Sequence, residues 1–428
     1  MYNNSSEGSG VSGANAEQRS AMDAAAKSLI PGFGVVLFDN PKDMSDGWAC
    51  RAGSAPFMIR NASELSNDTM WITSLAWDEY QMRAKKLSHL RRIDYLRSSL
   101  TSVAADLGRR IDGAYTRESC EILAKIFQQT MLIAIYSYQW QSPSNDLRGD
   151  VLSDDIRRAL PAAPKTQPHI RAALMSAYQS YSSPDWPYEF EPDTVTINMR
   201  YNRLDYASKI MATRVPDDAW TYIPPEQACK LRIDELLNPQ HPCLVEAAVE
   251  LSGMHADIAT LIAFGAQTTR RTGLRKWISQ PELQWLSRHA KVRVSSVLMA
   301  KSARALSQDV MLPQRLVGDP LFSLSLSAGL VAESHWSSIA ATIYNRTTKN
   351  NDVSSWAVWL RAMDRSLSFS LALKAHQAGF KVTGYGNGSI VLRVSRSSLP
   401  ACLDFADQND ICHPAFDALF KEHGVSHE

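Results

Sequence analysis

Residues 267–306, QTTRRTGLRKWISQPELQWLSRHAKVRVSSVLMAKSARAL, form an unusually basic stretch whose apolar spacing decides the predicted fold. Leu274, Trp277 and Ile278 are spaced as on one face of a helix, and the ELQWL segment repeats that spacing. We therefore expect two helices here, with the indoles of Trp277 and Trp285 turned towards a core.

A capping signal separates the two predicted helices. Ser279 and Glu282 stand three residues apart, as the two members of a capping box do. Pro281 fits the first turn of a helix, where its missing N–H is not needed. The second helix should begin near Gln280, directly after the first ends near Ile278. The stretch thus predicts a hairpin of two basic helices.

Basic residues are gathered in two strips of a nearly neutral chain. Residues 268–305 contain nine basic residues and one acid, Glu282, whereas the whole chain has 45 Lys and Arg against 44 Asp and Glu. A second strip, residues 83–110, has eight basic residues against two acids. Its apolar residues also follow a helical spacing, from 87 to 111. Charge is therefore segregated onto predicted helices.

The segregated charge has three interpretations. Clustered Lys and Arg attract phosphates through counterion release, although indoles in a core would not be available for base stacking. The same segregation is expected of proteins that dock charged partners, and of a helical face that is merely solvated. The candidate binding residues are Arg270, Arg271, Arg275, Lys276, Arg288, Lys291, Arg293, Arg91, Arg92 and Arg97.

The composition is that of an ordinary soluble globular protein. A length of 428 residues predicts two or three domains, and a hydrophobic fraction of 45% allows a sizeable core. The six cysteines form no CxxC pair, and the polar start of the chain lacks the apolar segment of a signal peptide. The most apolar segment, residues 130–140, is too short to span a bilayer. We expect a cytoplasmic protein without a membrane span.

The remaining segments complete the predicted fold class, which is mainly α, with multi-helix bundles and minor β elements. The β elements are expected near residues 34–60, 194–202 and 380–394, the last within a C-terminal α-β-β-α unit. The expected domains are a disordered tail at 1–26, a mostly helical N-terminal domain with short strands at 27–182, a helical domain with the basic helix hairpin at 194–311, and a C-terminal helical domain with a β-hairpin at 312–428.

No recognised catalytic or metal-binding pattern occurs in the sequence. It contains no GxSxG, SxxK, HExxH or P-loop, and its Cys and His residues are not spaced as zinc ligands. The segment GYGNGS, residues 384–389, is followed by β-branched residues, so Asn387-Gly388 predicts a hairpin turn rather than a phosphate-binding loop. We therefore expect no catalytic residue, no metal and no cofactor.

Residues 258–303 carry a resemblance to a known family. Gly265 lies in an apolar helical segment, the basic run LRKWI follows at 274–278, and LQWL follows at 283–286. This pattern resembles the helical middle of the sorting-platform accessory proteins of type III secretion systems, the YscK/SctK family. The resemblance implies a cytoplasmic, non-catalytic adaptor that joins a membrane ring to a sorting complex.

The sequence therefore predicts a non-enzymatic protein that binds a macromolecule. The first hypothesis is a cytoplasmic subunit or adaptor of a bacterial assembly such as a type III secretion apparatus, with a protein partner. The alternative is a DNA- or RNA-binding protein that uses the basic helices at 83–110 and 268–305. Steep weakening of binding by salt would favour the alternative.

Overall fold

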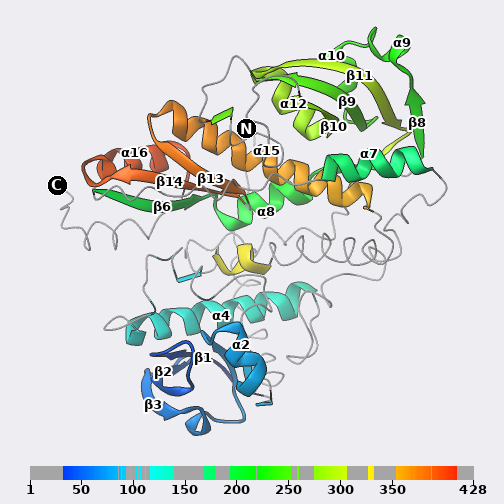
Figure 1. The fold of residues 1–428 in the computed structure, drawn as a ribbon. Helices are drawn as coiled ribbons and strands as arrows, with labels where there is room; N and C mark the ends of the chain where they lie inside the picture. The colour runs from blue at the N-terminus through cyan, green and yellow to red at the C-terminus, as the bar shows by residue number, and fades with distance from the viewer. Residues whose placement is uncertain are drawn as a thin grey trace, which may run out of the picture. The chain divides into compact units, whose positions relative to one another are not determined.

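The computed structural model divides the chain into two compact units (Figure 1). Unit 1 comprises Met1–Val151 and Leu312–Ser334, and unit 2 comprises Leu152–Met311 and His335–Glu428. Unit 1 therefore takes a segment from the middle of the chain. The structure describes residues 32–84, 86–87, 89–92, 100, 103–104, 107, 111, 116–138, 167–178, 193–217, 219–251, 258–259, 274–305, 326–331, 353–386 and 388–411.

Unit 1 contains a mixed five-stranded sheet with the order β3-β2-β1-β4-β5. Its strands are β1 (Phe33–Phe38), β2 (Ser45–Arg51), β3 (Phe57–Asn61), β4 (Met70–Thr73) and β5 (Leu90–Arg92). Neighbours β1, β2 and β3 are antiparallel, whereas β4 is parallel to β1 and β5 is parallel to β4. The central strand β1, FGVVLF, is buried throughout, as expected for a continuous apolar run.

The long helix α4 (Thr116–Tyr138) packs against β1 and β2. Its Cys120 thiol lies 3.1 Å from the carbonyl oxygen of Val35 and 3.3 Å from that of Trp48, and so ties the helix to both strands. Burial raises the pKa of this thiol, which therefore stays protonated. Shorter helices of unit 1 are η1 (Ala62–Glu64), α2 (Trp77–Glu79) and η2 (Tyr80–Ala84), and residues 326–331 are also helical.

The helix predicted across residues 87–111 is wrong at its start. Leu90–Arg92 form β5, and Leu90 is fully buried beside Trp71 of β4. The spacing of apolar residues here suits a helix, but pairing with a buried parallel strand outweighs this local preference. Helical backbone is present at residues 100 and 103–104, while much of the predicted segment lies outside the described residues.

Unit 2 contains an antiparallel four-stranded sheet with the order β10-β9-β11-β8. Its strands are β8 (Trp220–Ile223), β9 (Cys243–Glu250), β10 (Leu274–Ser279) and β11 (Lys291–Ala300). The helix α12 (Gln280–His289) connects β10 to β11 and packs against the sheet. The helices α7 (Pro168–Tyr178), α9 (Pro225–Ala228) and α10 (Ile233–Leu236) also belong to this part of the chain.

A second antiparallel sheet of unit 2 has the order β13-β14-β6. The chain forms β6 (Thr194–Arg200), α8 (Arg203–Met211), α15 (Ser355–Gln377), β13 (Lys381–Gly386), β14 (Ser389–Ser395), η6 (Arg396–Ser398) and α16 (Leu399–Gln408). The hairpin predicted at 380–394 is present, and the helices and strands from α15 to α16 follow the expected order. The strand predicted at 194–202 is also present, and β6 pairs with β14 along its whole length.

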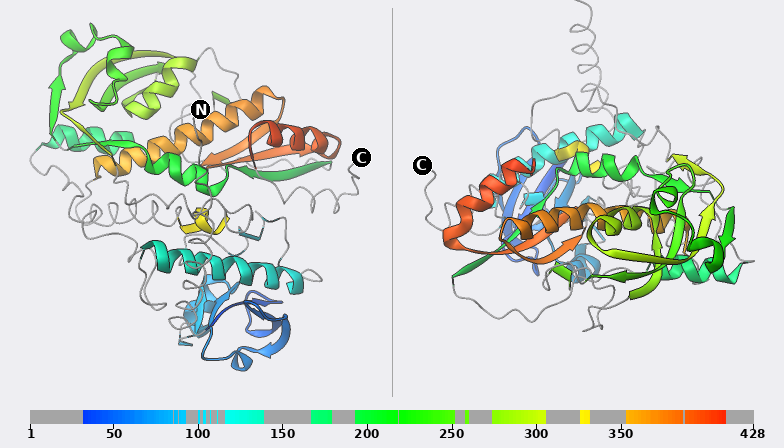
Figure 2. Two further views of the ribbon diagram at one scale, coloured as in Figure 1. Left: turned by 180° about the vertical axis from the view of Figure 1, so that it is seen from behind. Right: turned by 90° about the horizontal axis from the view of Figure 1, so that it is seen from above.

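The long helix α15 runs from the four-stranded to the three-stranded sheet within unit 2 (Figure 2). One hydrophobic core joins these elements, because Val245 of β9, Leu286 of α12, Phe369 of α15 and Leu392 of β14 belong to the same buried cluster. A separate pair of short strands, β7 (Arg214–Pro216) and β12 (Ala303–Ala305), is antiparallel.

The predicted fold class, a mainly α protein of helical bundles, is wrong, because the described residues form sheets of five, four, three and two strands. The basic helix hairpin is a strand–helix–strand segment, β10-α12-β11, in which only the central ten residues are helical. Long-range pairing of both strands with β9 decides this outcome. The predicted start of the second helix is correct, with Pro281 in its first turn and Ser279 as its N-cap.

Among the described helices, none combines the length and the apolar character needed to cross a bilayer.

Candidate nucleic-acid interface

The first half of β11 places basic side chains on one face of the four-stranded sheet. Lys291 and Arg293 are exposed, whereas Val292 and Val294 alternate with them and pack against the core. This period-two pattern is that of a half-buried strand. The register pairs Lys291 with Glu250 and Arg293 with Ala248, on the face opposite the buried Ala247 and Val249. We call the face that carries the even-numbered residues 244–250 of β9 the outer face. It is exposed at Lys291 and Arg293 and covered at Leu244.

The end of α12 adds a third exposed cation. Arg288 lies in the last turn of the helix, immediately before the chain enters β11. A cation in this position is favoured by the helix macrodipole. Arg288, Lys291 and Arg293 together are named the basic cluster. In the described part of the chain, none of the three is held in an ion pair.

The neighbouring His289 does not add a full charge at neutral pH. Its ring packs against that of Trp285 in a tilted arrangement, with 4.9 Å between the ring centroids. Burial, and then the nearby charge of Arg288, lower the pKa of His289 below its ordinary value. The charge of the cluster therefore comes from its Arg and Lys side chains.

The strand register brings other predicted residues towards the cluster. In β10, Arg275 pairs with Ala248, which in turn pairs with Arg293, so these two arginines flank one residue of β9. Lys276 is the next residue of β10 and pairs with Ala247. Arg275 and Arg293, which are 18 residues apart in the sequence, thus lie in one row across the sheet.

The rest of the predicted basic residues do not join this cluster in the described structure. Arg91 and Arg92 lie on β5 of unit 1, where one Arg91 guanidinium nitrogen donates to the carbonyl oxygen of Leu90. Arg97, Arg270 and Arg271 lie outside the described residues.

The single acid of the basic stretch is buried and already paired. Glu282 is 4% exposed and accepts a hydrogen bond of 3.0 Å from Nε of Arg365, whose side chain is 8% exposed. It also accepts bonds from the backbone N–H and from the hydroxyl of Ser279, and the first of these is the bond that the Glu side chain makes in a capping box. The carboxylate of Glu282 is therefore occupied inside the fold.

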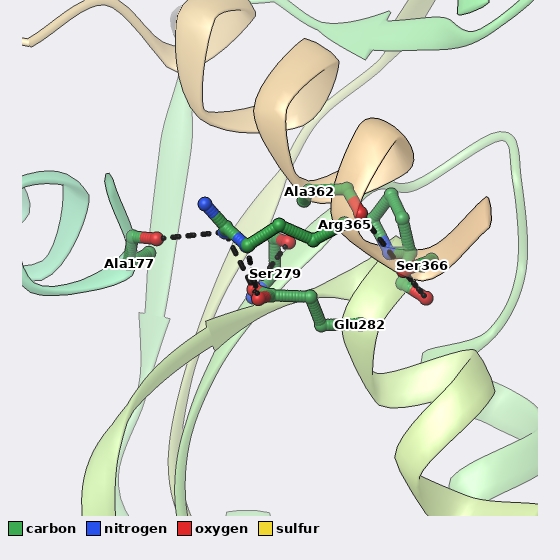
Figure 3. A network of polar contacts seen from close by, with 7 residues as sticks. Ala177, Ser279, Glu282, Ala362, Arg365 and Ser366 are labelled. Carbon is green, nitrogen blue, oxygen red and sulfur yellow. Dashed lines mark hydrogen bonds and ion pairs between the residues drawn. The ribbon is translucent and has the colours of Figure 1, made fainter. Parts of the chain in front are cut away.

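Arg365 links three helices through this network (Figure 3). Besides Glu282 of α12, its Nη2 donates to the carbonyl oxygen of Ala177, in the last turn of α7. The adjacent Ser366 hydroxyl contacts the carbonyl oxygen of Pro281 at 3.3 Å. The network fixes the start of α12, and the end of the same helix carries Arg288. Sequence reasoning did not find Arg365, because it lies 83 residues from Glu282.

The two indoles of the basic stretch are both partly buried, not exposed. Trp285 packs edge-on against Phe369 of α15, with 4.4 Å between the ring centroids. Trp277 lies on β10, where its backbone N–H donates to the hydroxyl of Ser176. Neither indole is therefore an open stacking surface, as the sequence predicted.

The pocket beside the buried ion pair is too small for an organic ligand. It is lined by Trp285, Phe369 and Tyr385 together with Glu282 and Arg365, and its volume is about 20 Å³. That volume holds about one water molecule. The pocket is thus a packing feature of the core.

Two other kinds of binding site, a metal site and a phosphate-binding loop, were considered in the described residues. No three His, Cys, Asp or Glu side chains among them are grouped to hold a metal ion. The glycine-rich segment between β13 and β14 is a hairpin turn, as predicted, with φ of +69° at Gly388. Its Gly388 N–H donates to Asp364 and to Ser368 of α15.

The accessibility of the thiols gives a simple test of this fold. Cys229 is exposed, whereas Cys50, Cys120, Cys243 and Cys402 are buried. Burial raises the pKa of Cys243 to about 12, which further slows its reaction. In a Cys412→Ser variant, we expect one thiol per chain to react rapidly with a thiol-specific reagent, and the other four only on unfolding. Rapid reaction of two or more thiols would contradict the described core.

No protein-family model and no curated protein matches this chain. Among solved structures, the chain is similar to phi29 DNA polymerase complexed with primer-template DNA, with 11% sequence identity and a TM-score of 0.41. The match covers 84% of this chain and 80% of the polymerase. A complex of the same polymerase with single-stranded DNA has a TM-score of 0.38 at 12% identity over the same shares of both chains. Similarity at this level does not establish a shared fold or activity.

Proposed function

We propose that unit 2 binds nucleic acid through the basic cluster. The observation that carries the proposal is that Arg288, Lys291 and Arg293 are exposed at one junction of helix and strand, with no ion pair among the described residues. Unpaired cations of this kind attract phosphates and release counterions. The proposed role is binding, and it assigns no catalytic residue.

The acids near the basic cluster limit where a phosphate can approach. Glu282, the acid nearest in sequence, is buried in its pair with Arg365 and does not compensate the cluster. Glu246 lies further along the outer face, where its carboxylate accepts a hydrogen bond from the Ser296 hydroxyl. Glu250 stands beside Lys291. The phosphates should therefore approach at Arg288 and Arg293, away from Glu246.

The first hypothesis from the sequence, an adaptor of a type III secretion apparatus, remains a prediction. The segment that carries the resemblance was expected to be helical, but its LRKWI run lies on β10. A protein partner and a cytoplasmic location likewise remain predictions. Exposed Lys and Arg on a strand edge can also serve only to prevent edge-to-edge aggregation, and the binding experiment distinguishes this role.

Reversing two charges of the cluster is expected to abolish most of the binding. The double variant K291E/R293E should bind a DNA oligonucleotide at least about ten-fold more weakly at low salt, because attraction to two phosphates is replaced by repulsion. The slope of log affinity against log salt should fall by about one for each phosphate that the protein no longer neutralises. Fluorescence anisotropy with the full chain measures both quantities.

A matched control separates a local site from general charge. Lys209 of α8 and Arg396 of η6 are exposed and lie beside the three-stranded sheet. The variant K209E/R396E changes the net charge by the same amount and should bind within about two-fold of the natural chain if the contact is local. Equal losses in both double variants, or no retained oligonucleotide at low salt in the natural chain, would refute the proposal.

A further inference from the structure

One large apolar side chain of unit 2 is open to solvent on an ordered strand. Tyr222 of β8 is 48% exposed, and the other large exposed apolar side chains found among the described residues, Phe57, Met58 and Met82, belong to unit 1. A single exposed apolar side chain is common on protein surfaces, so what matters for Tyr222 is its position relative to the basic residues.

Tyr222 shares the outer face with Lys291 and Arg293 of the basic cluster. The register pairs it with Leu298 of β11, which pairs with Leu244 of β9. Leu244 and Ala248 are four residues apart and therefore project from the same face. Since a strand rises about 3.3 Å per residue, the row of Tyr222 lies roughly 13 Å from the row of Arg293. A few nucleotides span that distance.

The ring of Tyr222 is held in place by α7. His169, in the first turn of that helix, contacts it edge-on with 6.2 Å between the ring centroids and an interplanar angle of 69°. Leu244 and Leu298, in the same row, are fully buried. Tyr222 thus stands at the exposed end of a packed row, and stacking a base on it would order no additional loop.

We infer that the nucleic acid bound at the basic cluster is single-stranded, and that one base stacks on Tyr222. This inference rests on the proposed function. The bases of a duplex are stacked on one another and cannot reach a tyrosine ring on a sheet, whereas a single strand exposes the π-face of every base. Glu246 lies between the two rows and disfavours a phosphate there, so a sugar or base would pass it.

The experiment compares a single-stranded oligonucleotide of about 20 nucleotides, longer than the 4–16 that one binding groove covers, with the duplex of the same length. The full chain is used, and fluorescence anisotropy measures the affinity. The variant Tyr222→Ala should bind the single strand at least about five-fold more weakly, because stacking of one base is removed. Its affinity for the duplex should be unchanged.

The control variant Tyr222→Trp, which keeps an aromatic ring at this position, should retain single-strand binding. About half of the Tyr222 side chain is exposed, so we expect only a small loss of thermal stability in Tyr222→Ala, from the lost contact with His169, and a folded chain in both variants.

The outcomes separate this inference from the proposed function. Unchanged single-strand binding by Tyr222→Ala, or equal weakening for both oligonucleotides, would overturn the stacking role. If K291E/R293E still weakened binding in that case, the phosphate site would stand and only the class of nucleic acid would be wrong. If K291E/R293E had no effect, both proposals would fall.

Discussion

Replacing Arg365 by methionine should destabilise unit 2 by about 3–5 kcal/mol, because the buried carboxylate of Glu282 would lose its counter-ion. The two side chains are almost fully buried and 2.9 Å apart. The same change also removes the bond from Arg365 to the carbonyl oxygen of Ala177. Hydrogen exchange of α12 and α15 in increasing urea would assign the loss to unit 2, since two units can unfold separately.

A second variant tests the cause of that loss. In E282Q/R365M, the amide introduced in place of the Glu282 carboxylate can still accept from the N–H of Ser279, but no charge is left unpaired. We expect it to be clearly more stable than R365M alone, since removing both partners avoids the cost of a buried lone charge. If the two substitutions were simply additive, the ion pair would not be coupled and our account of Glu282 would be wrong.

Replacing Gly388 by alanine should cost about 2–5 kcal/mol, the sum of a backbone cost and a packing cost. The residue has φ of +69°, a left-handed conformation that costs about 1–2 kcal/mol for a residue with a Cβ atom. A Cβ atom there would also lie 2.8 Å from the ring of Tyr206, and overpacking of this kind costs about 1–3 kcal/mol. The ring cannot move freely, because the Tyr206 hydroxyl donates to Asp364. Urea unfolding with the same hydrogen-exchange probe measures the loss.

Gly379 provides the matched control for this variant. Its φ is +90°, but a Cβ atom built there would meet nothing within 4 Å. Gly379→Ala should therefore show the backbone strain without the clash. Asparagine tolerates the left-handed region, so Gly379→Asn should be nearly neutral while Gly388→Asn remains destabilising. Similar losses at both positions would mean that the contact with Tyr206 contributes nothing.

Local signals in the sequence were sufficient for part of this fold. The capping box at Ser279 and Glu282 and the turn predicted at Asn387-Gly388 each depend on neighbours within a few residues. The structure contains the capping box and a hairpin that turns between Gly386 and Ser389. Strands β10 and β11 were read as helices because their partner, β9, lies outside any local window. The alternation in KVRVSSV, residues 291–297, was the available signal for a strand.

The candidate site was only partly accessible from composition. The density of Lys and Arg identified Arg288, Lys291 and Arg293, but not that one sheet face carries Lys291 and Arg293 beside the end of α12. The same sheet places Tyr222 on that face through pairing with Leu298, 76 positions later. The buried partner of Glu282 was equally distant in the sequence. Residues that meet only through tertiary contacts leave no local pattern.

The division of the chain into interleaved units has a consequence for synthesis. Ser327, in the segment that unit 1 takes from the middle of the chain, is buried and donates to the carbonyl oxygen of Ile126 in α4. Unit 1 therefore cannot be completed until the ribosome has made residue 334, after most of unit 2 has left it. The helices α15 and α16 of unit 2 are made later still, so unit 2 is completed only after unit 1.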